Sequence, residues 1–143
     1  MAQREVAQQM AAPPGRASLL TLATQVYADA RIVRRVRPGS FVPSPGVESA
    51  VVSLDVLTEP RVPRHSLPAF FGVSRAGFSA PRKQLRNALA NGLRLAPDIL
   101  HAGLQQAGID GRRRAETLSI GEWSRLVDEL AGNLLRQKPG GRE

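Results

Sequence analysis

The sequence predicts an α+β chain, with helices and two strands in its first part and helices alone in its second. Apolar and polar residues alternate over residues 48–57, which is the period of a half-buried strand. Apolar residues recur every three to four positions over residues 16–29 and 119–136, which is the period of amphipathic helices. Residues 58–68 contain three prolines and no periodicity, so they indicate a linker between the two parts.

The first part is predicted to begin with two helices. A short helical pattern extends from residue 1 to about residue 12, with Val6 and Met10 facing inward, before a Pro-Pro-Gly sequence breaks it. The second helix spans residues 16–29. Ser18 stands just before its apolar run, where a serine hydroxyl can accept a hydrogen bond from a free amide of the first turn. We therefore expect Ser18 to be an N-cap.

Two strands are predicted to follow these helices. Residues 31–36 are rich in β-branched side chains and roughly alternating. The strand at residues 48–57 places four apolar residues on one face, namely Ala50, Val52, Leu54 and Val56. The segment between the strands contains the stretch FVPSPG at residues 41–46 and further Pro and Gly residues. It therefore reads as a stiff loop and not as a tight hairpin turn.

The second part is predicted to be helical throughout. The expected helices cover residues 67–78, 80–92, 97–107 and 119–136. Pro97 suits the first position of the third of these helices, and Gly108 suits the residue that ends it. Ser119 and Glu122 have the spacing of a capping box at the start of the last one.

Composition excludes several classes of protein. The 143 residues contain no cysteine, which excludes disulfide scaffolds, thiol catalysis and cysteine-based zinc sites. The two histidines, His65 and His101, lack partners at metal-binding spacing, so no metal site is expected. No apolar run reaches the roughly 18 residues of a membrane span, and the N-terminus lacks the apolar region of a signal peptide. We expect a soluble, cytoplasmic protein without a membrane partner.

Positive charge is concentrated in the second part. The formal net charge is +8, and residues 61–143 hold fourteen Lys and Arg against seven Asp and Glu, whereas residues 1–60 hold six against five. An arginine-rich excess favours a polyanionic partner, because guanidinium groups match phosphate geometry and binding releases condensed counterions. A solvated basic surface without a partner explains the charge equally well.

Four sequence blocks follow one another along nearly the whole chain: QREVAQQMAAPPG, FVPSPGVESAVV, GFSAPRKQLRNAL and GIDGRRRAETLS. In this order and spacing they resemble the C-terminal part of the small-subunit ribosomal RNA adenine dimethyltransferases. The resemblance implies methyl transfer from S-adenosylmethionine to N6 of two adjacent adenines in small-subunit rRNA. It also implies that residues 1–60 are the C-terminal end of a Rossmann-like domain, including its last two strands, and that residues 61–143 are a helical rRNA-binding domain.

The cofactor and catalytic motifs of that family are absent from this sequence. It has no G-x-G-x-x-G after a predicted strand and no Asn-x-Pro-aromatic sequence. In a family member both would precede the position of Met1, so we expect this chain to be a truncated portion of such a protein. It is therefore expected to hold no catalytic residue, to bind no S-adenosylmethionine by itself and to be inactive alone.

Phe41 is the residue that the resemblance connects to the target base. A methylated adenine must leave its stack and be held between aromatic faces, and the family's F-x-P-x-P loop begins with a Phe that matches Phe41. An isolated aromatic residue more commonly plugs the edge of a sheet. Relatives commonly have Lys where this chain has Gly46, so a phosphate contact there is in doubt.

Basic residues of the second part are the candidate RNA contacts. They are Arg75, Arg82, Lys83, Arg86, Arg112 and Arg113. Arg82 and Arg86 are four residues apart, so we expect them on one face of the helix at residues 80–92. Arg114 and Glu116 match an Arg-Ala-Glu of the family, and we expect them to form an ion pair that holds the last helix.

The expected partner is small-subunit rRNA or a ribosomal subunit precursor, bound by a monomer. Two other interpretations stay open. In the first, the chain is a non-enzymatic RNA-binding module of ribosome assembly, although residues 1–57 would then expose sheet edges. Alternatively, its helical part is a DNA-binding helix-turn-helix, which equal affinity for duplex DNA and rRNA would support.

Overall fold

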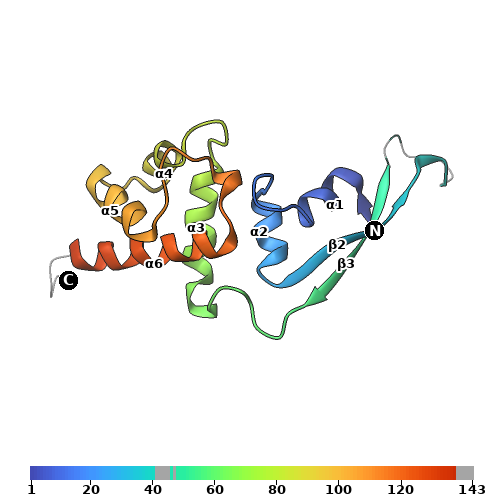
Figure 1. The fold of residues 1–143 in the computed structure, drawn as a ribbon, viewed down its shortest axis with the longest axis horizontal. Helices are drawn as coiled ribbons and strands as arrows, with labels where there is room; N and C mark the ends of the chain where they lie inside the picture. Colours follow the sequence, from blue (N-terminus) through green and yellow to red (C-terminus); the bar gives the residue numbers. More distant parts are fainter. Residues whose placement is uncertain (41–45, 47, 138–143) are drawn as a thin grey trace. The chain divides into compact units, whose positions relative to one another are not determined.

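The computed structural model describes residues 1–40, 46 and 48–137 (Figure 1). Contacts between Cα atoms divide the chain into two units, Met1–Arg61 and Val62–Glu143. Within the described ranges the fold is mixed, with a small three-stranded sheet and six α-helices. None of the helices in these ranges is long and apolar enough to cross a bilayer.

The first unit contains the sheet, whose strand order is β1-β3-β2 with antiparallel pairing throughout. Its strands are β1 (Ala2–Gln3), β2 (Ala28–Val36) and β3 (Ser49–Val56). The two predicted strands are confirmed as β2 and β3, which run side by side in Figure 1, while β1 was not predicted. Ala2 pairs with Ala50 in the sheet, so the first helix begins later than its sequence pattern suggests.

Two helices, α1 (Arg4–Met10) and α2 (Leu19–Gln25), pack against each other and against the sheet. The prediction that Val6 faces inward was wrong, since Ala7 is fully buried there and Val6 is exposed. Ser18 is confirmed as the N-cap of α2, because its Oγ accepts from Thr21 N at 3.4 Å.

The second unit contains α3 (Leu67–Phe78), α4 (Leu85–Leu93), α5 (Pro97–Ala107) and α6 (Ile120–Gln137). The helices α3 and α5 have the predicted bounds. Gly108 ends α5 in the left-handed conformation, with φ of 72°. The helix α4 begins five residues later than predicted, because the chain turns at residues 80–83 before Gln84 takes the extended conformation of an N-cap.

The core of the second unit is built around Trp123 of α6, whose side chain has no exposed surface. Phe78 of α3 lies against it, with ring centroids 5.8 Å apart. The chain approaches this core closely at Gly77, where a Cβ would come within 2.5 Å of the indole Cη2. Other fully buried side chains around it are Phe70, Leu85, Leu89, Leu118 and Leu126.

Exposed apolar side chains are concentrated in the first unit. Among residues 1–39, 46 and 48–132, whose burial is described, all the large apolar residues that are strongly exposed belong to it: Met1, Val6, Leu20, Tyr27, Val33, Leu54 and Val56. Along the apolar face predicted for β3, Ala50 is fully buried but Val56 is 79% exposed. The unit therefore covers only one end of this face of its sheet.

Candidate nucleic-acid interface

Three cations lie at the start of α4. Arg82 and Lys83 are in the turn that precedes the helix, and Arg86 is in its first turn. Arg82 and Arg86 therefore do not share a helical face as predicted, because the helix begins only at Leu85. All three side chains are exposed, and within the described ranges none of them pairs with a carboxylate. We call Arg82, Lys83 and Arg86 the basic cluster.

A shallow hollow of about 490 Å³ lies beside the basic cluster. It is lined by Arg82, Lys83, Gln84, Asn87, Ala90 and Asn91. Cations and side-chain amides are groups that bind phosphate and sugar oxygens, and they do so without reading the base sequence. Arg75, on α3, is also exposed, but it does not line this hollow.

The loop after α5 is fixed to the beginning of α4. Leu85 N donates to Arg113 O at 2.6 Å, and Arg86 N donates to Gly111 O at 3.0 Å. The first amides of a helix have no partner within the helix, so these two carbonyls satisfy donors that would otherwise need water. The loop also fits closely, because a Cβ on Gly111 would lie 3.0 Å from Arg86 Cβ. The position of Arg112 relative to Arg86 is therefore set by the backbone.

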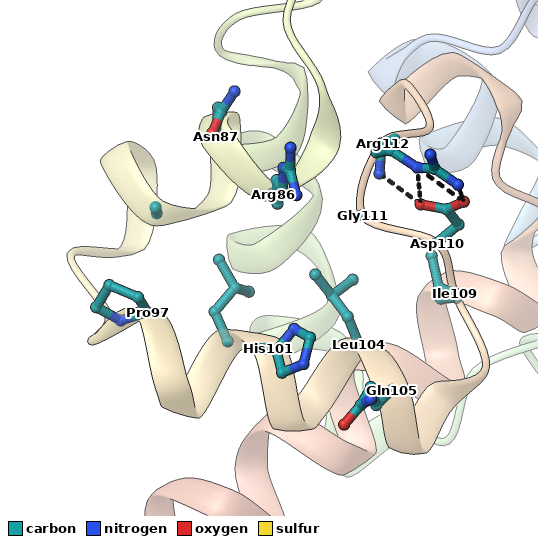
Figure 2. Close-up of a pocket in the computed structure, with 12 residues that line it drawn as sticks. Arg86, Asn87, Pro97, His101, Leu104, Gln105, Ile109, Asp110, Gly111 and Arg112 are labelled. Atoms are coloured by element: carbon teal, nitrogen blue, oxygen red, sulfur yellow. Dashed lines mark hydrogen bonds and ion pairs between the residues drawn. The ribbon is translucent and has the colours of Figure 1, made fainter.

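Arg112 is oriented by Asp110, as the dashed lines in Figure 2 show. Its Nη2 donates to Oδ2 at 2.9 Å and its Nε to Oδ1 at 3.2 Å. These bonds, together with one from Arg112 N, lower the pKa of Asp110 to about 2. Arg112 is thus paired with a neighbouring carboxylate, whereas the three cations of the basic cluster form no salt bridge within the described ranges.

Arg113 points into the protein and holds the start of α6. Its Nη1 and Nη2 donate to the two carboxylate oxygens of Glu122 at 2.6 and 3.0 Å, and Nη2 also donates to Thr117 O at 2.7 Å. The ion pair predicted between Arg114 and Glu116 does not occur within the described residues. Arg113 and Glu122 form one at this helix instead. The match to the family pattern pointed to the wrong pair, because the path of the loop brings the guanidinium of Arg113 to the capping box.

The predicted capping box is confirmed, and it gives the Glu122 carboxylate a second hydrogen-bonding partner besides Arg113. Ser119 N donates to Glu122 Oε1 at 2.9 Å, and Glu122 N donates to Ser119 Oγ at 3.2 Å. The hydrogen bonds from Arg113 and the Ser119 amide lower the pKa of Glu122 to about 2, against the opposing effect of burial. Both Arg113 and the Ser119 amide bind the charged form of Glu122, so protonation of this carboxylate would weaken both contacts. The free energy of unfolding of the second unit should therefore depend on pH.

Glu122→Gln is expected to destabilise the second unit by about 2 kcal/mol at pH 7. Because the folded-state pKa lies below the ordinary value of 4.5, the carboxylate stabilises the fold above that pH and stops doing so as the pH falls toward 2. The measurement is denaturant unfolding at pH 7 and pH 3, followed by the fluorescence of Trp123, the only tryptophan. The difference between wild type and variant should shrink at pH 3. Asp128→Asn, the matched control, removes an exposed carboxylate of the same helix and should change the free energy of unfolding little at either pH. An equal difference between wild type and Glu122→Gln at both pH values would contradict the prediction.

The other residues that the sequence singled out are Phe41 and the two histidines, at which no site was predicted. Phe41 and most of its loop lie outside the described residues. His65 and His101 are both exposed, and no group of three or more potential metal ligands occurs in the part of the chain that the structure describes. Sequence reasoning missed the role of Asp110, whose only signal was its position two residues before an arginine.

Comparison with known proteins agrees with the sequence blocks. The family described as "Ribosomal RNA adenine dimethylase" matches residues 1–132. The chain is 44% identical over 132 residues to the "Ribosomal RNA small subunit methyltransferase A" of Clostridium acetobutylicum, covering 91% of this chain and 48% of that protein. It is 43% identical over 133 residues to the protein of the same name from Dehalococcoides mccartyi, covering 93% of this chain and 46% of that one. The chain thus spans about half the length of the curated relatives it matches.

Solved structures show the same fold. A dimethyladenosine transferase from Plasmodium falciparum superposes with a TM-score of 0.71 at 22% identity, over 92% of this chain and 55% of that one. The 23S rRNA methyltransferase ErmE gives 0.64 at 25% identity, over 90% of this chain and 52% of that one. With a family match over most of its residues and a fold shared with rRNA methyltransferases, the chain belongs to the ribosomal RNA adenine dimethylase family.

Proposed function

We propose that this chain supplies the rRNA-binding part of an adenine N6-dimethyltransferase. In that enzyme, methyl groups pass from S-adenosylmethionine to two adjacent adenines of small-subunit rRNA. One observation carries the proposal: the basic cluster, Arg82, Lys83 and Arg86, is exposed without carboxylate partners at a hollow beside α4. Such a surface follows a phosphate backbone by charge and geometry, and so positions RNA without reading its bases.

We propose further that residues 1–61 belong to a larger methyltransferase sheet. The exposed apolar side chains of this unit support the proposal, because a sheet face that is covered only at one end is normally continued by other elements. The residues present do not fit S-adenosylmethionine, since the sequence lacks a glycine-rich turn after a strand. Methyl transfer therefore requires residues beyond this sequence, and the 143 residues alone are expected to be inactive.

Phe41 is proposed to stack on the target adenine in the complete enzyme. Its support is the F-x-P-x-P pattern, in which prolines restrict the backbone and limit the entropy lost when a base is held. Arg112 is proposed as a peripheral contact to RNA, and Arg75 as a further cation of the same unit. Arg113 remains a predicted contact, but its donors are directed to Glu122 and Thr117.

The proposal predicts salt-sensitive, RNA-selective binding by the 143-residue chain. Fluorescence anisotropy would compare a hairpin from the 3′ end of small-subunit rRNA with a DNA hairpin of the same sequence, at 50 and 200 mM salt. We expect tighter binding to the RNA and a loss of about tenfold or more in affinity between the two salt concentrations. Equal affinity for RNA and DNA would favour the DNA-binding interpretation, and affinity that is independent of salt would exclude the basic cluster as the contact surface.

A further inference from the structure

A cavity of about 500 Å³ lies in the second unit between α4 and α5, closed on one side by residues 109–112. In Figure 2, His101 and Leu104 rise from α5 toward the space between the helices, and Arg86 comes from α4. The volume is within the range of about 300–1,000 Å³ that is typical of small-molecule sites. No prediction from the sequence located this cavity.

The cavity has an apolar floor. Leu100, Leu104 and Ile109 are each at most 5% exposed, and Ala90 and Pro97 complete the apolar lining. An ion such as free phosphate gains nothing from such a floor, because burying a charge against apolar groups is costly. The floor suits a flat ring system of low charge.

The rim of the cavity has the opposite character. Arg86 and Arg112 stand at one side. Arg86 forms no salt bridge within the described ranges, although its charge also acts on Asp110, and its Nε donates to Gln84 Oε1 at 3.1 Å. Asp110 also lies at this rim, but its carboxylate is occupied by Arg112. His101 and Gln105, both exposed residues of α5, add an aromatic ring and an amide. A ligand that combines a ring with an anionic group matches both halves of the site.

The cavity adjoins the basic cluster. Arg86 belongs to both, and Asn87 and Ala90 border both the cavity and the hollow that contains Arg82 and Lys83. A polyanion lying along the basic cluster would therefore come close to the cavity. This proximity favours a nucleotide that is part of an RNA strand over a free metabolite.

We infer that this cavity receives one unstacked nucleotide of the bound RNA, with its base on the apolar floor beside His101 and its phosphate at Arg86. Single-stranded and bulged RNA is commonly held by such stacking on aromatic and guanidinium planes. The inference rests on the proposed RNA-binding function and adds a preference for RNA with a looped-out base. The residues involved are all in the second unit, whereas Phe41 belongs to the first.

The test compares two RNA hairpins of identical stem sequence, one with a single bulged 2-aminopurine and one without the bulge. The wild-type 143-residue chain should bind the bulged hairpin at least about fivefold more tightly, and the 2-aminopurine fluorescence should change on binding. Equal affinity for the two hairpins would overturn the inference while leaving the proposed function intact. Failure to bind either hairpin would remove the proposed function itself.

Two variants with matched controls make the outcome specific. Gln105→Ala removes the amide at the rim, and His101→Ala removes the ring; both residues line the cavity and not the hollow, so each should reduce the preference for the bulged hairpin and leave the affinity for the unbulged one unchanged. Gln8→Ala and His65→Ala change the same residue types at exposed positions away from the cavity and should retain the preference. Trp123 fluorescence establishes that each variant is folded. If both cavity variants keep the wild-type preference, the bulge binds elsewhere and the inference is wrong.

Discussion

Gly77→Ala is expected to destabilise the second unit by about 2–3 kcal/mol, as overpacking of a rigid core does. The added Cβ would lie 2.5 Å from Trp123 Cη2 and 3.3 Å from Leu85 Cδ1, so it cannot be accommodated without movement. Both neighbours are completely buried, which leaves them little room to move. Because protein interiors are close-packed, the added Cβ can be accommodated only if α6 moves away from α3, which weakens the packing between the two helices.

Gly72→Ala is the matched control for this prediction. It makes the same substitution in the same helix, but its Cβ would meet nothing within 4 Å. Since alanine is favoured over glycine in a helix, this variant should be unchanged or more stable by about 0.5–1 kcal/mol. Denaturant unfolding followed by Trp123 fluorescence measures both variants. If the two substitutions have effects of equal sign and size, the close packing of Gly77 on the indole is not what limits stability.

Local signals in the sequence were sufficient for much of the second unit. Pro97 and Gly108 mark the ends of α5, and the capping box of Ser119 and Glu122 marks the start of α6. Each of these residues acts within one turn of its own backbone, through a fixed φ, a left-handed conformation or a hydrogen bond to a neighbouring amide. Such signals can be read without knowledge of the tertiary structure.

The features that the sequence did not reveal depend on contacts distant in the chain. The late start of α4 follows from a turn at residues 80–83 and from the carbonyls of Gly111 and Arg113, which receive the first amides of the helix. Ala2 and Gln3 belong to a strand because β3 offers them an edge to pair with. The periodicity of apolar residues indicates only which side chains share a face of a helix or strand, and not which distant segment packs or pairs with them.

In the candidate site, too, some features could be predicted from single residues and others depend on contacts between distant parts of the chain. The cations of the basic cluster could be named as candidates from the sequence, because charge is a property of the residue itself, but the shared helical face expected from the spacing of Arg82 and Arg86 was wrong. The cavity was not, since its lining comes from α4, α5 and the loop between α5 and α6, which are brought together only by folding. The assignment of Arg113 to an ion pair with Glu122 likewise needed the path of that loop.

Replacing Arg82, Lys83 and Arg86 together by glutamine is expected to weaken RNA binding about 100-fold at low salt, at about 1 kcal/mol for each exposed charge contact. The slope of log affinity against log salt should become shallower by about 2–3, because each lost phosphate contact contributes about 0.7–0.9. Anisotropy titrations of the unbulged hairpin at several salt concentrations measure both quantities.

The matched control separates position from net charge. Arg31, Arg34 and Arg35 are exposed on β2 in the first unit, and replacing them by glutamine removes the same three positive charges. Long-range steering depends on total charge, whereas a phosphate contact depends on where the guanidinium or ammonium group stands. If the two triple variants lose affinity and salt dependence equally, RNA is held by the overall charge of the chain and not by the surface beside α4. If only the first variant loses them, the start of α4 is the contact that places the rRNA on this unit.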